Sequence, residues 1–243
     1  MQIFARPVSF YAQIMPLPLA VLSQLPLLAP LPQVTIAHLA QNASERSFSK
    51  REVVLQKDAQ AQALCFLIEG RLQGVDFTLD GREVGLYFVN SGDYFGDVAV
   101  IDGHPQPDYV TAVSRSRVVF IPKELVRPIL FAHPKVAEVL CSNLSLRLRQ
   151  VSAQRRILGL ANPLQRVCAQ LQVLMHSTGG VSLVPNTPTH QELAIMINAS
   201  RETVSRVFQL LQGRGIVERQ GNDLRVDNAG LLSAIAAGQQ PAE

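Results

Sequence analysis

Cysteine is scarce in this sequence of 243 residues, and its three copies stand far apart. Cys65, Cys141 and Cys168 form no CxxC pair and have no histidine at the spacing of a metal ligand. Zinc and iron–sulfur centres need several such ligands close together, so we predict no metal and no cofactor. We expect three free thiols in apolar surroundings instead, which fits a reducing, cytoplasmic location.

Charge is also sparse and nearly balanced. Charged residues make up 17% and hydrophobic residues 47% of the chain, which is enough apolar material for sizeable cores. The net charge of +3 is compatible with a polyanionic partner but too small to indicate one. The sequence has no Ser/His/Asp order, metal motif or P-loop. We therefore predict no catalytic residues and no enzyme activity.

A long apolar run without helix breakers is missing as well. Residues 14–32 are apolar but contain five prolines, and proline interrupts a helix. The segment is therefore not expected to span a membrane, and no membrane partner is predicted. We expect an irregular segment that packs on the following domain or on a partner. The prolines are Pro16, Pro18, Pro26, Pro30 and Pro32.

Between residues 48 and 122 the sequence consists of short apolar or alternating runs separated by turn-forming residues. Runs of this length and spacing are typical of an all-β sandwich or jelly roll. Asp80-Gly81, between two apolar runs, predicts a β-hairpin. The strand-like runs are EVVLQ, ALCFLIEG, LQGVDFTL, EVGLYFV, DYFGDVAV, YVTAVS and RVVFIP.

The pattern changes at residue 134, after which no helix breaker occurs before Gly159. A helix of about 25 residues is on the order of 37 Å long, and its apolar stripe is more than a small β domain needs. We expect a second copy of the chain to cover it; packing within one chain is the alternative. Asn162-Pro163 then predicts the start of another helix, over 164–175. The apolar positions are Val136, Val139, Leu140, Leu144, Leu146, Leu148 and Val151.

Two further helix starts follow in close succession. Thr189 and Glu192 are spaced as a capping box, Asn198 suits the left-handed conformation of a tight turn, and Ser200 is a second N-cap. Two short helices joined by such a turn are typical of a helix-turn-helix. Positions expected to be buried are Leu193, Ala194 and Ile197 in the first helix and Val204, Val207, Phe208 and Leu211 in the second.

The opposite face of the second helix carries Arg201, Glu202, Ser205, Arg206 and Gln209. Arginine can bond guanine, and glutamate can accept from cytosine, so this face could read DNA bases. The alternative is an ordinary solvated face, on which Glu202 and Arg206 form an i, i+4 ion pair. A predicted hairpin at residues 216–226 lies where the wing of a winged helix would, which favours the DNA-reading hypothesis.

These motifs together resemble the CRP/FNR transcription factors. The stretch ASRETVSRVFQLLQGRGIVE is similar to the family's recognition helix and following strand, and FLIEGRLQGVDFTLDGREVGLYFVNSGDYFGDVAV to its cyclic-nucleotide-binding β-roll. The resemblance covers about residues 44–226 and implies an α+β fold of β-roll (jelly roll), long dimerisation helix and winged helix-turn-helix. The implied domains are a Pro-rich extension and helix at 1–43, a β-roll at 44–133, the dimerisation helix at 134–160 and the winged helix at 161–243.

The resemblance further implies a homodimer on a palindrome in double-stranded DNA. Arg201, Glu202 and Arg206 match base-reading positions, and with Ser205 they fit the E-x-x-S-R pattern of the FNR branch. Arg201 favours TGTGA-like over TTGAT half-sites. RNA polymerase is a further candidate partner, although the loop at 175–186 is dissimilar to the loop that contacts it in the family. Positions that resemble phosphate contacts are His190, Gln191, Ser200, Thr203 and Gln220.

The effector pocket departs from the family's pattern. Cyclic-AMP members carry Gly-Glu-Leu and then an Arg-Ser pair whose arginine neutralises the cyclic phosphate. Here Gln106-Pro107 stands in place of that pair, with Asp108 beside it, and no arginine lies between Arg82 and Arg115. A phosphate facing Asp108 without a cation would be strongly disfavoured, so we expect that cyclic AMP does not control the protein.

The remaining ligand-site candidates are Gly96, Asp97 and Val98, which match Gly-Glu-Leu with a shorter acid, and Ser152 on the long helix. We expect these residues to serve an unidentified small-molecule effector or none. The leading interpretation is a sequence-specific transcription regulator. The alternative is a cyclic-nucleotide-sensing regulatory protein whose main role is ligand binding.

Overall fold

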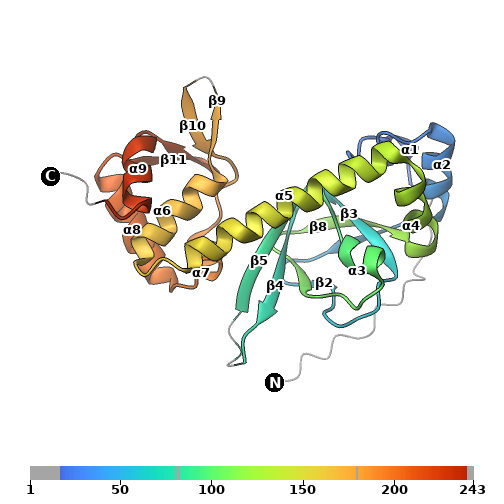
Figure 1. Ribbon diagram of the computed structural model, residues 1–243, viewed down its shortest axis with the longest axis horizontal. Helices are drawn as coiled ribbons and strands as arrows, with labels where there is room; N and C mark the ends of the chain where they lie inside the picture. Colours follow the sequence, from blue (N-terminus) through green and yellow to red (C-terminus); the bar gives the residue numbers. More distant parts are fainter. Residues whose placement is uncertain (1–16, 80, 82, 179, 240–243) are drawn as a thin grey trace. The chain divides into compact units, whose positions relative to one another are not determined.

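The computed structural model of the protein describes residues 17–79, 81, 83–178 and 180–239. The chain folds as two compact units that meet in the sequence between Ser145 and Leu146. Figure 1 traces the elements of each unit along the sequence. The meeting point falls inside a long helix, and the domain boundaries expected from the sequence stay predictions.

Two antiparallel sheets build the first unit. One has the strand order β1-β8-β3-β6 and the other the order β2-β7-β4-β5. A core of buried apolar side chains draws on strands of both sheets, including Phe48, Leu72 and Phe120. The predicted jelly-roll character is therefore confirmed. The strands are β1 (Ser44–Phe48), β2 (Val53–Leu55), β3 (Ala63–Glu69), β4 (Arg71–Phe77), β5 (Glu83–Asn90), β6 (Tyr94–Phe95), β7 (Tyr109–Ala112) and β8 (Ser116–Pro122).

The run DYFGDVAV differs from the expectation of a strand. Only Tyr94–Phe95 is extended, and a short helix, α3 (Asp97–Asp102), follows. Gly96 takes a φ of 75° and so turns the chain in a conformation that glycine adopts without strain. A short apolar run cannot be assigned to strand or helix by periodicity alone. Of the predicted hairpin turn, Asp80 lies outside the described residues, but β4 and β5 pair antiparallel on either side of it.

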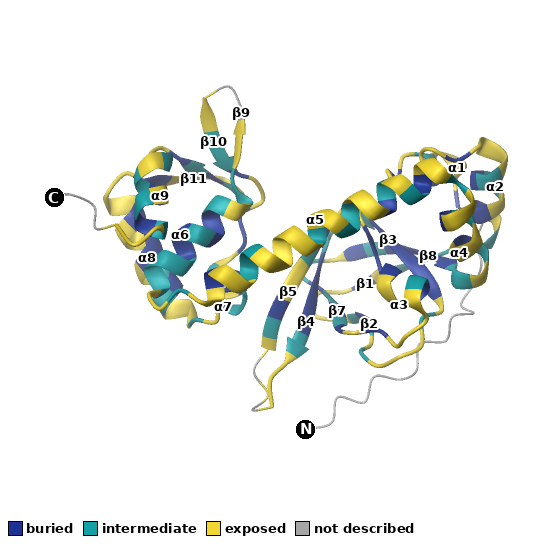
Figure 2. Cartoon of the chain, viewed as in Figure 1, coloured by how far each residue is buried: buried dark blue, intermediate teal, exposed yellow. Residues whose placement is uncertain are grey.

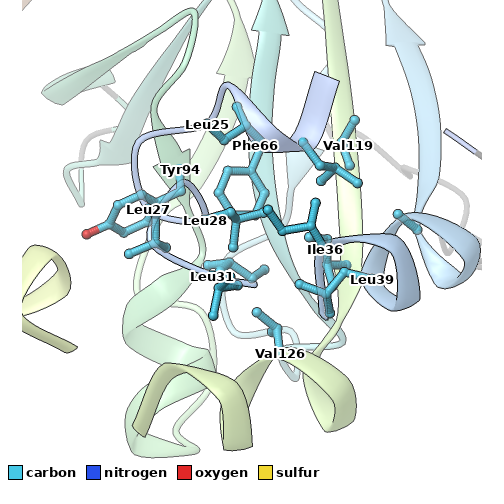
Figure 3. Close-up of a cluster of buried hydrophobic side chains, with 14 of the residues drawn as sticks. Leu25, Leu27, Leu28, Leu31, Ile36, Leu39, Phe66, Tyr94, Val119 and Val126 are labelled. Carbon is cyan, nitrogen blue, oxygen red and sulfur yellow. The ribbon is translucent and has the colours of Figure 1, made fainter. Parts of the chain in front are cut away.

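The apolar N-terminal segment covers one end of the first unit. It contains the short helix α1 (Leu19–Ser23) and then turns, and the helix α2 (Gln33–Asn42) follows it. Figure 3 shows leucines of α2 and of the turns before it packed against Phe66 and Val119 of the sheet and Val126 of α4 (Lys123–Ala132). Packing on the following domain is thus confirmed for residues 17–32, and residues 14–16 of the predicted segment lie outside the described ones.

The long helix α5 (Pro134–Leu158) confirms the prediction of a helix in this region. Its first two turns contribute Val136 and Leu140 to the core of the first unit. Further along, Leu146, Leu148 and Val151 are 53%, 68% and 64% exposed, and Figure 2 shows exposed positions along this part of α5. Three of the seven predicted apolar positions are therefore exposed in the single chain.

The second unit combines helices with a small sheet of order β11-β12-β10-β9. Asn162 caps its first helix by accepting from the Leu164 N–H at 2.9 Å, as predicted. No helix in the described part of the chain is long and apolar enough to cross a membrane. The elements are α6 (Pro163–Leu174), β9 (His176–Thr178), β10 (Val181–Val184), α7 (His190–Met196), α8 (Arg201–Gly213), β11 (Val217–Gln220), β12 (Asp223–Val226) and α9 (Ala229–Ala236).

Candidate nucleic-acid interface

The helix α7 begins with the predicted capping box. The Thr189 N–H donates to Glu192 Oε2 at 2.6 Å, and the Glu192 N–H donates to Thr189 Oγ1 at 3.3 Å. Both bonds satisfy backbone or side-chain groups that a helix start would otherwise leave unpaired. Leu193, Ala194 and Ile197 are buried as expected, so the cap fixes which side of α7 faces the core.

The turn between α7 and α8 is held at Asn198. This residue has a φ of 50°, in the left-handed region that asparagine tolerates better than most residues. The Ala199 N–H closes the turn onto the carbonyl of Ala194 at 2.9 Å. Arg166 of α6 donates to the Asn198 carbonyl at 3.4 Å. The angle between the two helices is therefore set by local backbone geometry and by a contact from a third helix.

The helix α8 starts at Ser200, whose hydroxyl accepts from the Thr203 N–H at 3.1 Å. The Ser200 and Thr203 hydroxyls also lie 2.9 Å apart and share a hydrogen bond. The buried face consists of the four predicted residues, so the remaining positions point outward. These buried residues are Val204, Val207, Phe208 and Leu211.

The outward face of α8 carries the five residues singled out from the sequence, and together they line a hollow in the surface: Arg201, Glu202, Ser205, Arg206 and Gln209. The carboxylate of Glu202 interacts with the start of its own helix. Hydrogen bonds from the Glu202 N–H and the Ser200 hydroxyl lower the pKa of this carboxylate. Among the described residues Glu202 forms no ion pair with Arg206. Glu202 and Arg206 are therefore not bound to each other, whereas the Ser205 hydroxyl is hydrogen-bonded to His190.

The wing is the hairpin of β11 and β12, in which Gln220 pairs with Asp223 across Gly221-Asn222. Arg219 and Gln220 are exposed at its tip, and Arg219 Nε donates to the Gly221 carbonyl at 3.0 Å. The wing was predicted, whereas Arg219 was not singled out. Its position one residue before Gln220 in the predicted hairpin was the signal available.

His190 is placed differently from a free surface histidine. Its Nδ1 lies 2.9 Å from Ser205 Oγ, and its ring centroid lies 4.6 Å from that of Phe208. Burial, followed by the charges of Arg219 and Arg201, lowers the pKa of His190 below its usual range. Of the other expected phosphate contacts, Gln191 is exposed beside the α7 cap, and Ser200 and Thr203 lie at the α8 cap.

The residues expected at the effector site lie in several places. Gly96 and Asp97 stand at the start of α3, where Asp97 is 1% exposed, while Val98 is 43% exposed. Ser152 on α5 donates its hydroxyl to the Leu148 carbonyl at 3.0 Å. Among the described residues, no group of three or more candidate metal ligands is present.

A tyrosine that sequence reasoning missed lies in the same β-roll. The Tyr87 hydroxyl donates to Asp108 Oδ1 at 3.2 Å, and Gln106 Nε2 donates to the same oxygen at 2.7 Å. Burial raises the pKa of Asp108, although both hydrogen bonds oppose the rise. A Cβ added to Gly74 on the neighbouring strand would collide with the Tyr87 ring. A glycine inside a strand was the signal that another group approaches closely.

Two family models match the chain in the order that the fold would require. Residues 45–133 match a cyclic nucleotide-binding domain, and residues 165–235 match a Crp-like helix-turn-helix domain. The first match covers the β-roll and α4, and the second runs from α6 to α9. The two matches therefore assign separate parts of the chain to an effector-type module and a DNA-binding module.

Curated relatives match most of their own length. The "Cyclic AMP receptor protein" of Thermus thermophilus is 27% identical over 79% of this chain and 88% of the relative. The "CRP-like cAMP-activated global transcriptional regulator" of Mycobacterium tuberculosis is 25% identical over 83% and 92%. Among solved structures, FixK2 from Bradyrhizobium japonicum superposes with a TM-score of 0.67 at 20% identity, over 83% of this chain and 99% of that one. The last match supports the fold.

Proposed function

The chain belongs to the CRP/FNR family of DNA-binding transcription regulators, and we propose that it binds a DNA palindrome with TGTGA-like half-sites as a homodimer. It is a regulator and not an enzyme. As a DNA-binding protein it would act in the cytoplasm. RNA polymerase is a candidate partner once the protein is on DNA.

The outward face of α8 is the observation that carries the proposal. In a helix-turn-helix the N-terminal part of the second helix meets base edges in the major groove. Arg201 and Arg206 would each donate two parallel hydrogen bonds to guanine, and Glu202 would accept from a cytosine amino group. These side chains are not engaged in ion pairs with each other among the described residues. These side chains could therefore bond to bases without first breaking an ion pair with one another.

Phosphate contacts would surround this face. Hydroxyls and N–H groups at helix starts suit phosphate oxygens, and both helix starts of the motif present them. Such contacts fix the position of the protein on the duplex without reading sequence. The residues proposed for this role are His190, Gln191, Ser200, Thr203 and Gln220.

The exposed apolar part of α5 supports the homodimer. Leu148 and Val151 are one turn apart on the helix and more than half exposed. Large exposed apolar side chains that recur along one helix face are usual at helix–helix interfaces. A two-fold dimer would present two copies of α8 to half-sites about one helical turn of DNA apart.

Control by cyclic AMP is not part of the proposal. Asp108 is buried and already accepts two hydrogen bonds, and the Tyr87 ring lies across Gly74 beside it. A cyclic phosphate placed there would meet a carboxylate without a compensating cation. Gly96, Asp97, Val98 and Ser152 would then serve an unidentified effector, or the protein would be competent for DNA as it is made.

Selection of bound sequences from random duplex DNA, without added nucleotide, tests the proposal. We expect enrichment of a palindrome with TGTGA-like arms. Enrichment of no sequence, both with and without cyclic nucleotides, would contradict it. Enrichment only with a cyclic nucleotide would keep DNA binding and overturn the account of the effector site. In a parallel thermal-shift assay, a rise of several degrees with cyclic AMP would do the same.

A further inference from the structure

The two helices of the DNA-binding motif are joined at the surface by one side-chain hydrogen bond. His190, the first residue of α7, places its Nδ1 2.9 Å from Ser205 Oγ, one turn into α8. The imidazole also packs on Phe208, with the ring planes inclined by 38°. A half-buried ring held on two sides has little freedom to turn. The Ser205 hydroxyl is thereby held in one direction on the face that lines the hollow.

We propose that His190 is a positioning residue for base reading, which orients the Ser205 hydroxyl and decides the hydrogen-bonding role left to it. The inference rests on the proposed function, because it concerns the same DNA-facing surface. It goes further by giving one residue two tasks. The second imidazole nitrogen, Nε2, remains for a phosphate, while Nδ1 acts on a neighbouring base reader.

The chemistry of a hydroxyl explains why the histidine matters. Serine has one hydrogen to donate and two lone pairs that accept. When Nδ1 carries no proton, the Ser205 hydrogen is used on the imidazole, and the oxygen can only accept from adenine or cytosine amino groups. When Nδ1 carries a proton, it donates to Ser205, and the hydroxyl hydrogen is free for guanine or thymine acceptors.

The surroundings favour the first arrangement. The charges acting on the ring are those of Arg201 at the start of α8 and Arg219 in the wing, and both oppose a positive imidazole. A neutral ring has one N–H. A histidine that also contacts a phosphate must donate from Nε2, which leaves Nδ1 as the acceptor. Ser205 would then face DNA as an acceptor.

Sequence selection with a matched set of variants tests the inference. His190→Phe keeps an aromatic ring on Phe208 but removes the nitrogen that bonds to Ser205. Ser205→Ala removes the hydroxyl at the other end of the same hydrogen bond, and the double variant removes both groups. His190→Asn places an amide oxygen near the position of Nδ1 and should keep the contact. We expect His190→Phe and Ser205→Ala to lose about fivefold discrimination at the same base pair of each half-site. The double variant should lose no more, and His190→Asn should retain the preference.

Two outcomes would contradict the inference. If His190→Phe weakens binding to every sequence by one factor and leaves the base preference unchanged, His190 is a phosphate contact only and the inference is wrong. Additive effects of His190→Phe and Ser205→Ala would also contradict it. If the unchanged protein enriches no site, the proposed function fails and this inference with it. If the unchanged protein enriches a palindrome and only the variants disagree, the inference alone fails.

Discussion

Glu202 stands at the start of α8 among two arginines, a serine and a glutamine. Its pKa is lowered first by its own backbone N–H and the Ser200 hydroxyl, and only then by the arginines. A carboxylate near a helix N-terminus is also favoured by the helix dipole. Glu202 therefore stays ionised and directed by its own helix, without an ion pair that DNA would have to break.

Replacing Glu202 by alanine should relax base preference at one position of the half-site. The loss of a good base contact corresponds to about 1–3 kcal/mol of discrimination, which selection followed by competition binding would measure. Glu124→Ala removes an exposed carboxylate from α4 and changes net charge equally, so it is the control. An equal effect of both variants would mean that charge alone, and not base reading, explains the loss.

His190 should make the stability of the second unit depend on pH. Because its pKa is lowered below the ordinary value of 6.5, the folded state binds this proton less readily than the unfolded chain. The stabilisation is therefore present above about pH 6.5 and is lost as pH falls through the lowered pKa. We expect the melting temperature to fall more between about pH 7 and pH 5 in the unchanged protein than in His190→Phe. Equal slopes would contradict this.

Individual contacts were the part least accessible from the sequence. The α8 face could be predicted, because helical periodicity separates Val204 and Phe208 from Arg201 and Glu202. The contacts of His190 with Ser205 and of Tyr87 with Asp108 could not. Each joins residues that are far apart in the sequence, and periodicity within one element carries no information about such distances.

At the scale of elements, the short connections hold the site in shape. Asn198 shows this best, since a single residue with positive φ sets how α8 leaves α7. A single residue also decides the packing of two strands in the β-roll, where Gly74 of β4 leaves room for the Tyr87 ring of β5.

Replacing Asn198 by valine should destabilise the second unit. A β-branched residue in the left-handed region costs roughly 1–2 kcal/mol, whereas Asn198→Gly should be nearly neutral because glycine takes this conformation freely. Denaturant unfolding of the two variants gives the comparison. If valine and glycine behave alike, the turn is not the constraint described above.

Replacing Gly74 by alanine should also destabilise the protein, because the new methyl group meets the Tyr87 ring. Overpacking of this kind costs about 1–3 kcal/mol. In a Tyr87→Ala background the same change should cost much less, since the obstacle is gone. A double-mutant cycle followed by thermal unfolding measures the coupling; additive effects would show that the two sites do not interact.

Element types were predicted well where patterns were long and poorly where they were short. The 25 residues of α5 left no doubt about a helix, but the six residues of α3 did not differ from a strand in hydropathy. What decides α3 is the turn at Gly96, which is a property of backbone geometry more than of apolar pattern.

For the whole molecule, the order of modules could be predicted, because alternating runs, one long helical stripe, and two capped helices followed by a hairpin are distinct patterns in the sequence. In the proposed homodimer, the exposed Leu148 and Val151 would form part of the interface.

Replacing Leu148 by glutamate should weaken self-association. A buried leucine contributes about 1.5–3 kcal/mol, so the dissociation constant of the dimer should rise at least about tenfold. Sedimentation equilibrium measures this, with Gln150→Glu on the far side of the same helix as the control. Unchanged association in Leu148→Glu would remove α5 as the dimer interface, and a monomeric unchanged protein would remove the dimer itself.

The buried leucines between residues 17 and 42 have a practical consequence for dividing the protein into fragments. The matched nucleotide-binding segment begins at residue 45, yet Leu22, Leu28 and Leu39 are completely buried against its sheet. An expression fragment that begins at residue 45 would lack these leucines and would expose the apolar side chains of the sheet to solvent. Fragments meant for ligand screening or crystallisation should therefore start before Leu17, since the unit that folds is longer than the unit that sequence comparison recognises.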